Sequence, residues 1–197
     1  MTSLFNARYI VSFLFIFTVL VLLFFDLKLE WQFSREGIAA GEWWRFMTAH
    51  FIHLNIQHGL VNLSLLAVLL YSLGTQLSLF RWLLSGAVLC LSISLGLLYF
   101  SLNVEWYVGF SGVLHGFLVL GLSFGAFKSR DVYQGFVLLL VVFKVIREQL
   151  PGFDIFHLAD WLGGAVVVDA HFYGVIVGAI LSAIFLLVDF TLLNVSK

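Results

Sequence analysis

Charged residues make up only 11% of this 197-residue chain, which also contains a single proline and a single cysteine. Hydrophobic residues, in contrast, account for 62% of the sequence and aromatic residues for 17%. A soluble protein of this size would lack the polar groups that it needs to cover its surface. The composition therefore excludes an ordinary soluble domain and predicts an all-α, polytopic membrane protein that lies in a lipid bilayer.

Other absences exclude further classes of function. The net charge of −1 offers no basic surface, so we expect no nucleic-acid partner. Because Cys90 is the only cysteine, no intramolecular disulfide can form, and we expect a buried thiol. The chain has no H-E-x-x-H, no G-x-G-D and no glycine-rich phosphate loop, which argues against zinc proteases, aspartyl proteases and nucleotide-binding proteins. His50 and His53 have no third ligand at a recognisable spacing, so we expect no metal and no cofactor.

Six apolar runs are long enough, or almost long enough, to cross a bilayer as helices. They are residues 9–25, 57–76, 82–101, 111–127, 132–147 and 168–190. The first run is not followed by a small-residue cleavage site, so we expect a retained helix rather than a signal peptide. No linker rich in proline, glycine or serine divides the chain, which predicts one domain over residues 1–197 and a bundle of six transmembrane helices.

The positive charges of the short loops predict the orientation. Arg81 lies between the second and third runs, and Lys128 and Arg130 lie between the fourth and fifth, whereas residues 102–110 contain no lysine or arginine. The positive-inside rule then places both termini in the cytoplasm. Five cations on the opposite side, in residues 26–56 and near the end of the fifth run, reduce this asymmetry.

Three polar residues stand near the starts of the even-numbered spans: His58, Ser111 and His171. Under the predicted topology all three lie at a similar depth near the outer face. A polar side chain costs energy inside lipid, and a serine hydroxyl becomes a good nucleophile only when a base accepts its proton. We therefore expect Ser111 to be a nucleophile and His171 its general base. Asn62 follows His58 by one helical turn, so both side chains face the same way.

Two groups of small residues predict that the helices of the serine and the histidine pack closely. Gly112 and Gly116 form a G-x-x-x-G pattern, and Gly174 and Gly178 lie three and seven residues after His171. Small residues let two backbones approach each other in lipid. This approach would bring the imidazole within about 3 Å of the serine hydroxyl, which is hydrogen-bond distance.

Several other polar residues have a simpler interpretation. Residues 43–45, two tryptophans and an arginine, are typical of the outer membrane interface. We expect His50 and His53 to anchor that interface or to cap loop structure. Asp169 lies two positions before His171, which points it away from the histidine, so we interpret it as an interfacial carboxylate. The remaining acidic residues that we interpret as solvated loop charges are Glu30, Glu36, Asp154 and Asp160.

Together these motifs resemble those of the rhomboid intramembrane serine proteases, and the resemblance covers essentially all six spans. It is carried by Trp44-Arg45, by the spacing of His53, His58 and Asn62, by Gly109-Phe110-Ser111-Gly112, and by Ala170-His171 followed by Gly174 and Gly178. The resemblance implies a catalytic dyad of Ser111 and His171. It also implies that His58 and Asn62 hold the oxyanion, to which backbone N–H groups at the start of the serine helix, such as that of Gly112, can add hydrogen bonds.

One departure from the common rhomboid pattern is informative. Most rhomboid proteases have a tyrosine one turn after the serine, where this chain has His115 followed by Gly116. We expect His115 to pack against or orient His171 rather than to transfer a proton itself. The run Gly109–Gly116, together with Asp169–Gly174, resembles the rhombosortase branch. That branch implies a Gram-negative inner-membrane enzyme, open to the periplasm, whose substrates carry a C-terminal glycine-rich motif, a hydrophobic helix and a basic tail.

Two other functions compete with this interpretation. A transporter or channel would need polar groups through the full depth of the membrane, whereas these cluster on one side. A protease-dead rhomboid relative, acting in binding or quality control, would have the same fold, but such relatives typically lose the serine or the histidine. For a protease, we expect cleavage near the outer face, at small residues close to the start of the substrate's anchor helix. The sequence gives no indication of the oligomeric state.

Overall fold

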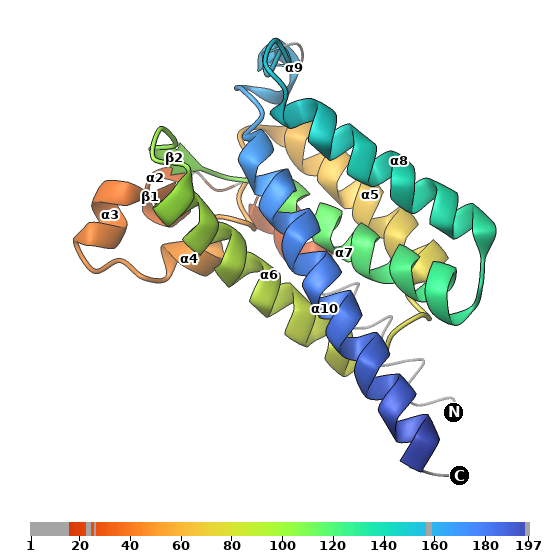
Figure 1. Cartoon of the computed structure of the whole chain (residues 1–197). Helices are drawn as coiled ribbons and strands as arrows, with labels where there is room; N and C mark the ends of the chain where they lie inside the picture. The colour runs from red at the N-terminus through yellow and green to blue at the C-terminus, as the bar shows by residue number, and fades with distance from the viewer. Residues whose placement is uncertain (1–15, 23–24, 26, 157–158, 196–197) are drawn as a thin grey trace.

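A computed structural model of the chain describes residues 16–22, 25, 27–156 and 159–195. Residues 16–22 are helical and belong to the first expected span, of which residues 9–15 and 23–24 lie outside the described residues. The long helices are α5 (Ile56–Leu73), α6 (Leu79–Phe100), α7 (Ser111–Ser123), α8 (Val132–Gln149) and α10 (Val168–Val195). The short elements are α2 (Lys28–Trp31), β1 (Phe33–Ser34), α3 (Arg35–Ala39), α4 (Arg45–Thr48), β2 (Trp106–Tyr107), η1 (Phe124–Lys128) and α9 (Ala159–Leu162). The fold is mostly helical, as the composition predicts (Figure 1).

Four helical segments among the described residues are long and apolar enough to cross a membrane. They are α5, α6, the continuous segment Ser111–Lys128 formed by α7 and η1, and Val168–Leu192 of α10. Helix α8 has 18 residues, but Lys144, Arg147 and Glu148 give it too many charges to qualify. The second, third, fourth and sixth expected spans are therefore present as helices long and apolar enough to cross a bilayer, whereas the full count of six is not confirmed. Two of these charged residues, Lys144 and Glu148, line the same cavity as Ser111.

Helix α7 is the centre of the bundle. It contacts α5, α6, α8 and α10, and 72% of its apolar window is buried inside the protein, compared with 17% for α10. Figure 1 shows α7 enclosed between α10 on one side and α5 on the other. A helix that is apolar on all sides, as α7 is, is expected in such a buried position. The first residue of this buried helix is Ser111.

The predicted close packing of α7 and α10 is present. A Cβ atom added to Gly112 would lie 2.7 Å from the carbonyl oxygen of Ala170. One added to Gly174 would collide with the carbonyl oxygen of Gly112, and one added to Gly178 with that of Gly116. At these positions only glycine lets the two backbones approach, as small residues do between membrane helices.

The segment before α5 packs beside α6, is fixed to it by Arg35 and is held together internally by Arg45. Strand β1 pairs antiparallel with β2, which leads into α7. Arg35 donates hydrogen bonds to carbonyl oxygens at the end of α6, including those of Leu97 and Leu98 at 2.6 and 2.8 Å. Arg45 is buried and donates to the carbonyl oxygens of Leu29 and Gln32, both at 2.8 Å. The Arg45 guanidinium thus holds backbone carbonyl oxygens together inside the protein, and its expected depth at the outer membrane interface stays a prediction.

Candidate active site

The backbone before Ser111 turns sharply so that the serine begins α7. Gly109 has a φ of +121°, a conformation that favours glycine, and an added Cβ would lie 2.9 Å from the ring of His58. The amide of Gly109 donates to the carbonyl oxygen of Ala49 at 3.0 Å, and the Tyr107 hydroxyl donates to the Gly109 carbonyl oxygen at 2.5 Å. The glycine that the motif contains at this position is thus required by the turn and by the neighbouring imidazole.

Ser111 and His171 lie within hydrogen-bond distance, as the sequence predicts. The Ser111 Oγ atom is 2.9 Å from Nε2 of His171, which is the fourth residue of α10 and is buried. The other ring nitrogen, Nδ1, lies 2.9 Å from Oε2 of Glu148. A carboxylate can only accept, so Nδ1 carries the proton and Nε2 is free to accept from the serine hydroxyl. This arrangement is the one that a serine nucleophile and a histidine base require.

Glu148 is the residue that sequence reasoning missed. It comes from α8, its side chain is only 5% exposed, and its second oxygen lies 2.7 Å from Nζ of Lys144. The predicted orientation depends on the cations Lys144 and Arg147 of this segment, and no prediction involved its carboxylate. The available signal was a Lys144–Glu148 pair at i and i+4 in an otherwise apolar run, because an ionisable residue inside a span indicates a functional site.

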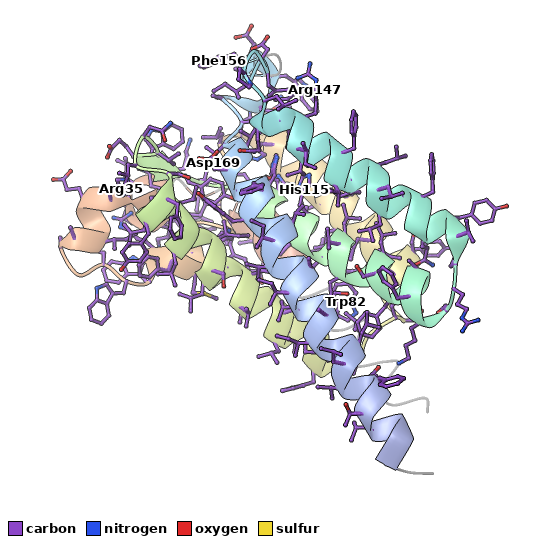
Figure 2. All side chains as sticks on the ribbon, in the orientation of Figure 1. Arg35, Trp82, His115, Arg147, Phe156 and Asp169 are labelled. Carbon is purple, nitrogen blue, oxygen red and sulfur yellow. The ribbon has the colours of Figure 1, made fainter. Side chains whose placement is uncertain are left out.

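His115 belongs to α7, and its side chain contacts residues of α8 and α10 as well as the backbone of its own helix (Figure 2). Its Nδ1 donates to the carbonyl oxygen of Ser111 at 2.7 Å, so its Nε2 is an acceptor and receives a hydrogen bond from Lys144 at 2.9 Å. Its ring stacks on that of His171, with 4.1 Å between the ring centres and 24° between the planes. This geometry agrees with the packing and orienting role expected for His115.

The two residues expected at the oxyanion line the same cavity as Ser111. This cavity has a volume of about 270 Å³, and its polar lining comprises His58, Asn62, Ser111, His115, Lys144, Glu148 and His171. The Asn62 side-chain amide donates to the carbonyl oxygen of His58 at 2.9 Å, which leaves its second hydrogen available. His58 Nδ1 is buried and has no hydrogen-bond partner among the described residues. Both side chains are thus beside the serine, although neither is bonded to it.

The two histidines before α5, His50 and His53, are buried in the protein interior. His50 is fully buried, with Nε2 2.9 Å from the carbonyl oxygen of Cys90, whose own thiol is buried as expected. His53 packs edge-on against His58, with 5.0 Å between ring centres. Burial lowers the pKa of His53 to about 3, so this side chain is neutral near pH 7. Both rings therefore pack inside the protein, His50 against α6 and His53 against His58, and the expected roles of interface anchoring and loop capping stay predictions.

Two remaining expectations concern carboxylates and metals. Asp169 is half-buried, and the carboxylate that contacts His171 is that of Glu148. The possible ligand atoms of His115, Glu148 and His171 lie within 4.8 Å of one another. The Lys144 ammonium, however, is hydrogen-bonded to both His115 and Glu148. A metal ion at this position would have to displace the Lys144 ammonium from both residues.

Comparison with known proteins adds one finding. A family model described as the Rhomboid domain matches residues 40–188, which is more than half of the chain and includes Ser111, Glu148 and His171. A search of curated proteins gave no match.

Proposed function

The chain belongs to the rhomboid family, and on this basis we propose that it is an intramembrane serine endopeptidase. It is an integral membrane protein, with four apolar helices long enough to span a bilayer. The proposal adds the first and fifth expected spans to give a six-helix protease of one domain. The observation that carries the proposal is the 2.9 Å contact between Ser111 Oγ and His171 Nε2 in a cavity at the end of the bundle.

In the proposed reaction His171 accepts the hydroxyl proton of Ser111 while Oγ attacks the scissile carbonyl carbon. His171 then returns the proton to the leaving amine, and water or another acceptor resolves the acyl-enzyme. The oxyanion receives hydrogen bonds from His58, Asn62 and the backbone N–H of Gly112. Gly112 is the second residue of α7, where N–H groups have no partner within the helix. Phe110, the N-cap residue, has no side-chain acceptor for them.

We propose that the substrate is a membrane protein cleaved near the outer face. The cavity lies at the end of the bundle opposite Arg81 and Lys128, which the positive-inside rule places in the cytoplasm. A substrate helix must unwind before attack, and glycine lowers that cost by about 1 kcal/mol per residue relative to alanine. A C-terminal anchor with glycines before its helix and a basic tail after it, as in rhombosortase substrates of the Gram-negative inner membrane, fits these requirements.

The catalytic residues are tested with purified protein in proteoliposomes and a model protein carrying a C-terminal anchor of this kind. We expect Ser111→Ala and His171→Ala each to reduce cleavage to less than about a thousandth of the wild-type rate, because each removes a group that the chemistry needs. Ser123→Ala, a buried serine near the other end of α7, is the matched control and should cleave at the wild-type rate within about twofold. Substantial cleavage by either dyad variant would contradict the assignment of the dyad, whereas absence of cleavage by the wild type would favour the protease-dead alternative.

The substrate proposal has a separate test. The glycines of the model anchor are replaced by leucine, and the new C-terminus of the released portion is identified by mass spectrometry. We expect cleavage on the outer side, at the small residues, and a strong loss of cleavage when they are replaced. Cleavage on the cytoplasmic side, or indifference to the glycines, would contradict the substrate proposal while leaving the dyad intact.

A further inference from the structure

We propose that Glu148 is a positioning residue for His171 and that Lys144 holds Glu148 in place. The site then contains a Ser–His–Glu arrangement rather than a Ser–His dyad alone. This inference rests on the proposed protease function. It assigns a role to two charged residues of α8, the helix that apolar length and composition alone do not identify as a span.

The three groups form a continuous line from three different helices. Ser111 Oγ of α7 is 2.9 Å from Nε2 of His171 on α10, and Nδ1 of that ring is 2.9 Å from Oε2 of Glu148 on α8. A neutral imidazole carries its proton on one of two nitrogens. Because the carboxylate only accepts, it stabilises the form protonated on Nδ1, which is the form that accepts from the serine. It also fixes the plane of the ring.

Lys144 solves the problem of keeping a carboxylate inside the bundle. The Glu148 side chain is 5% exposed, and a buried carboxylate without a partner is strongly unfavourable. Lys144 lies one turn before it, contacts it at 2.7 Å and is itself 48% exposed. The ammonium therefore compensates the carboxylate while keeping part of its own hydration.

The network closes on the serine through His115. Lys144 donates to Nε2 of His115 at 2.9 Å, and Nδ1 of His115 donates to the carbonyl oxygen of Ser111 at 2.7 Å. The five residues Ser111, His171, Glu148, Lys144 and His115 thus form a ring of hydrogen bonds. Every donor in this ring meets an acceptor with one choice of tautomer for each histidine. A network in which no two donors and no two acceptors face each other is the arrangement expected where reacting groups are held in place.

In the proposed step the proton moves from Ser111 Oγ to His171 Nε2 as the bond from Oγ to the carbonyl carbon forms. The resulting imidazolium is stabilised by the Glu148 carboxylate, which keeps its hydrogen bond from Nδ1 and does not take the proton. The groups that face His171 are Ser111 and His115 on α7, Lys144 and Glu148 on α8, and His58 on α5.

The alternative is that the Lys144–Glu148 pair only fastens α8 to α10. The two roles differ in what a charge-free replacement does. Glu148→Gln alone leaves the ammonium without its carboxylate, whereas Lys144→Met with Glu148→Gln removes both charges. Replacing both members of a buried ion pair is often neutral or stabilising. If the pair is only structural, the double variant should therefore regain both the unfolding midpoint and the kcat that Glu148→Gln loses.

The test measures kcat, KM and the thermal unfolding midpoint with the anchored model substrate. We expect Glu148→Gln to lower kcat by at least about 10²-fold with KM within about threefold of wild type. The double variant should recover the unfolding midpoint but not kcat, and Glu148→Asp should recover part of kcat. Arg147→Met, which removes the neighbouring exposed cation, is the matched control and should stay within about twofold.

Recovery of kcat by the double variant, or a Glu148→Gln kcat within about threefold of wild type, would overturn this inference while leaving the protease intact. Absence of Ser111-dependent cleavage in the wild-type protein would instead overturn the proposed function, and this inference with it. Cleavage by the wild type and by Ser111→Ala is therefore measured first.

Discussion

Two clusters of charged side chains join helices near opposite ends of α10. At one end Glu148 contacts Lys144 and His171, and at the other Asp189 contacts Arg81 and Lys128, each at 2.5 Å. His171 and Asp189 are 18 positions apart, which corresponds to about 27 Å along the helix. Each cluster contains one carboxylate and at least one cation, yet only the first lines the cavity of Ser111.

The difference lies in the second oxygen of each carboxylate. Both oxygens of Asp189 accept from cations, and the Arg81 guanidinium rests on the ring of Phe185, 4.8 Å from its centre. Glu148 gives one oxygen to a cation and the other to an imidazole. A carboxylate whose two oxygens both accept from cations therefore only joins helices. A carboxylate with one oxygen not used by a cation can also accept a hydrogen bond from a catalytic base and hold it in place. The predictions below test this distinction.

The largest effect is expected where α7 and α10 touch beneath the Glu148 cluster. Gly174→Val would force its side chain against the Gly112 carbonyl oxygen and move the two helices apart. We expect cleavage to fall by about 10³-fold, since displacement of a catalytic group by about 1 Å can cost about 10²-fold and the fold is weakened as well. The control is Ala183→Val, which also introduces valine but at an exposed position of α10 nearer Asp189. It should change cleavage by less than about twofold. Equal losses of cleavage at Gly174 and Ala183 would mean that the two ends of α10 do not differ in their importance for catalysis.

Removal of an oxyanion donor should have a smaller effect. We expect Asn62→Ala to lower kcat by about 10²-fold, and His58→Ala by a similar factor, because one of several donors is lost in each case. The unfolding midpoint of each variant, measured in parallel, separates a loss of catalysis from a loss of packing. Normal kcat in the double variant would mean that the Asn62 bond to the His58 carbonyl oxygen serves only to stabilise α5.

The contribution of His115 can be divided into stacking and hydrogen bonding. His115→Phe keeps a ring that can stack on His171 but removes the bonds to Ser111 and Lys144. We expect kcat to fall by about tenfold, because Glu148 and Lys144 remain to hold the base. His115→Ala, which removes the ring as well, should have the larger effect. If the two variants are equally impaired, the hydrogen bonds rather than the stacked ring carry the role of His115.

The smallest effect on cleavage is expected at the opposite cluster. Asp189→Asn should leave kcat within about threefold of wild type, because this carboxylate lies far from the serine and its ion-pair partners among the described residues are Arg81 and Lys128. It should lower the free energy of unfolding by about 1 kcal/mol, because the substitution weakens two partly exposed ion pairs that are each worth up to about that much. Comparison of kcat and unfolding midpoint with those of Glu148→Gln measures the contrast between the clusters directly. A comparable loss of kcat in both variants would contradict it.

The sequence was sufficient wherever a local pattern carries the information. Ser111 and His171 are 60 residues apart, but each begins an apolar helix, and the glycine spacing predicts that these helices meet. The positions of α5, α6, α7 and α10 followed from hydrophobic length alone. Each of these features can be detected without knowing which helices are neighbours in space.

The sequence failed where the meaning of a residue depends on its neighbour in space. Glu148 stands in a charged stretch of α8 whose relation to His171 appears only when α8 packs against α10. Arg45 beside two tryptophans has the composition of a membrane interface, and only the fold reveals the two backbone carbonyls that bury it. In both cases the side chain satisfies a polar group that local periodicity does not identify.

The central claim, that His171 activates Ser111 for nucleophilic attack, is tested most directly by the rate at which a fluorophosphonate modifies the purified protein in proteoliposomes, followed by mass spectrometry of the modified peptide. We predict a single adduct on Ser111 in the wild type, none in Ser111→Ala, and modification at least about 10²-fold slower in His171→Ala. Modification of Ser111 at the same rate with and without His171, or of another residue instead, would contradict the account.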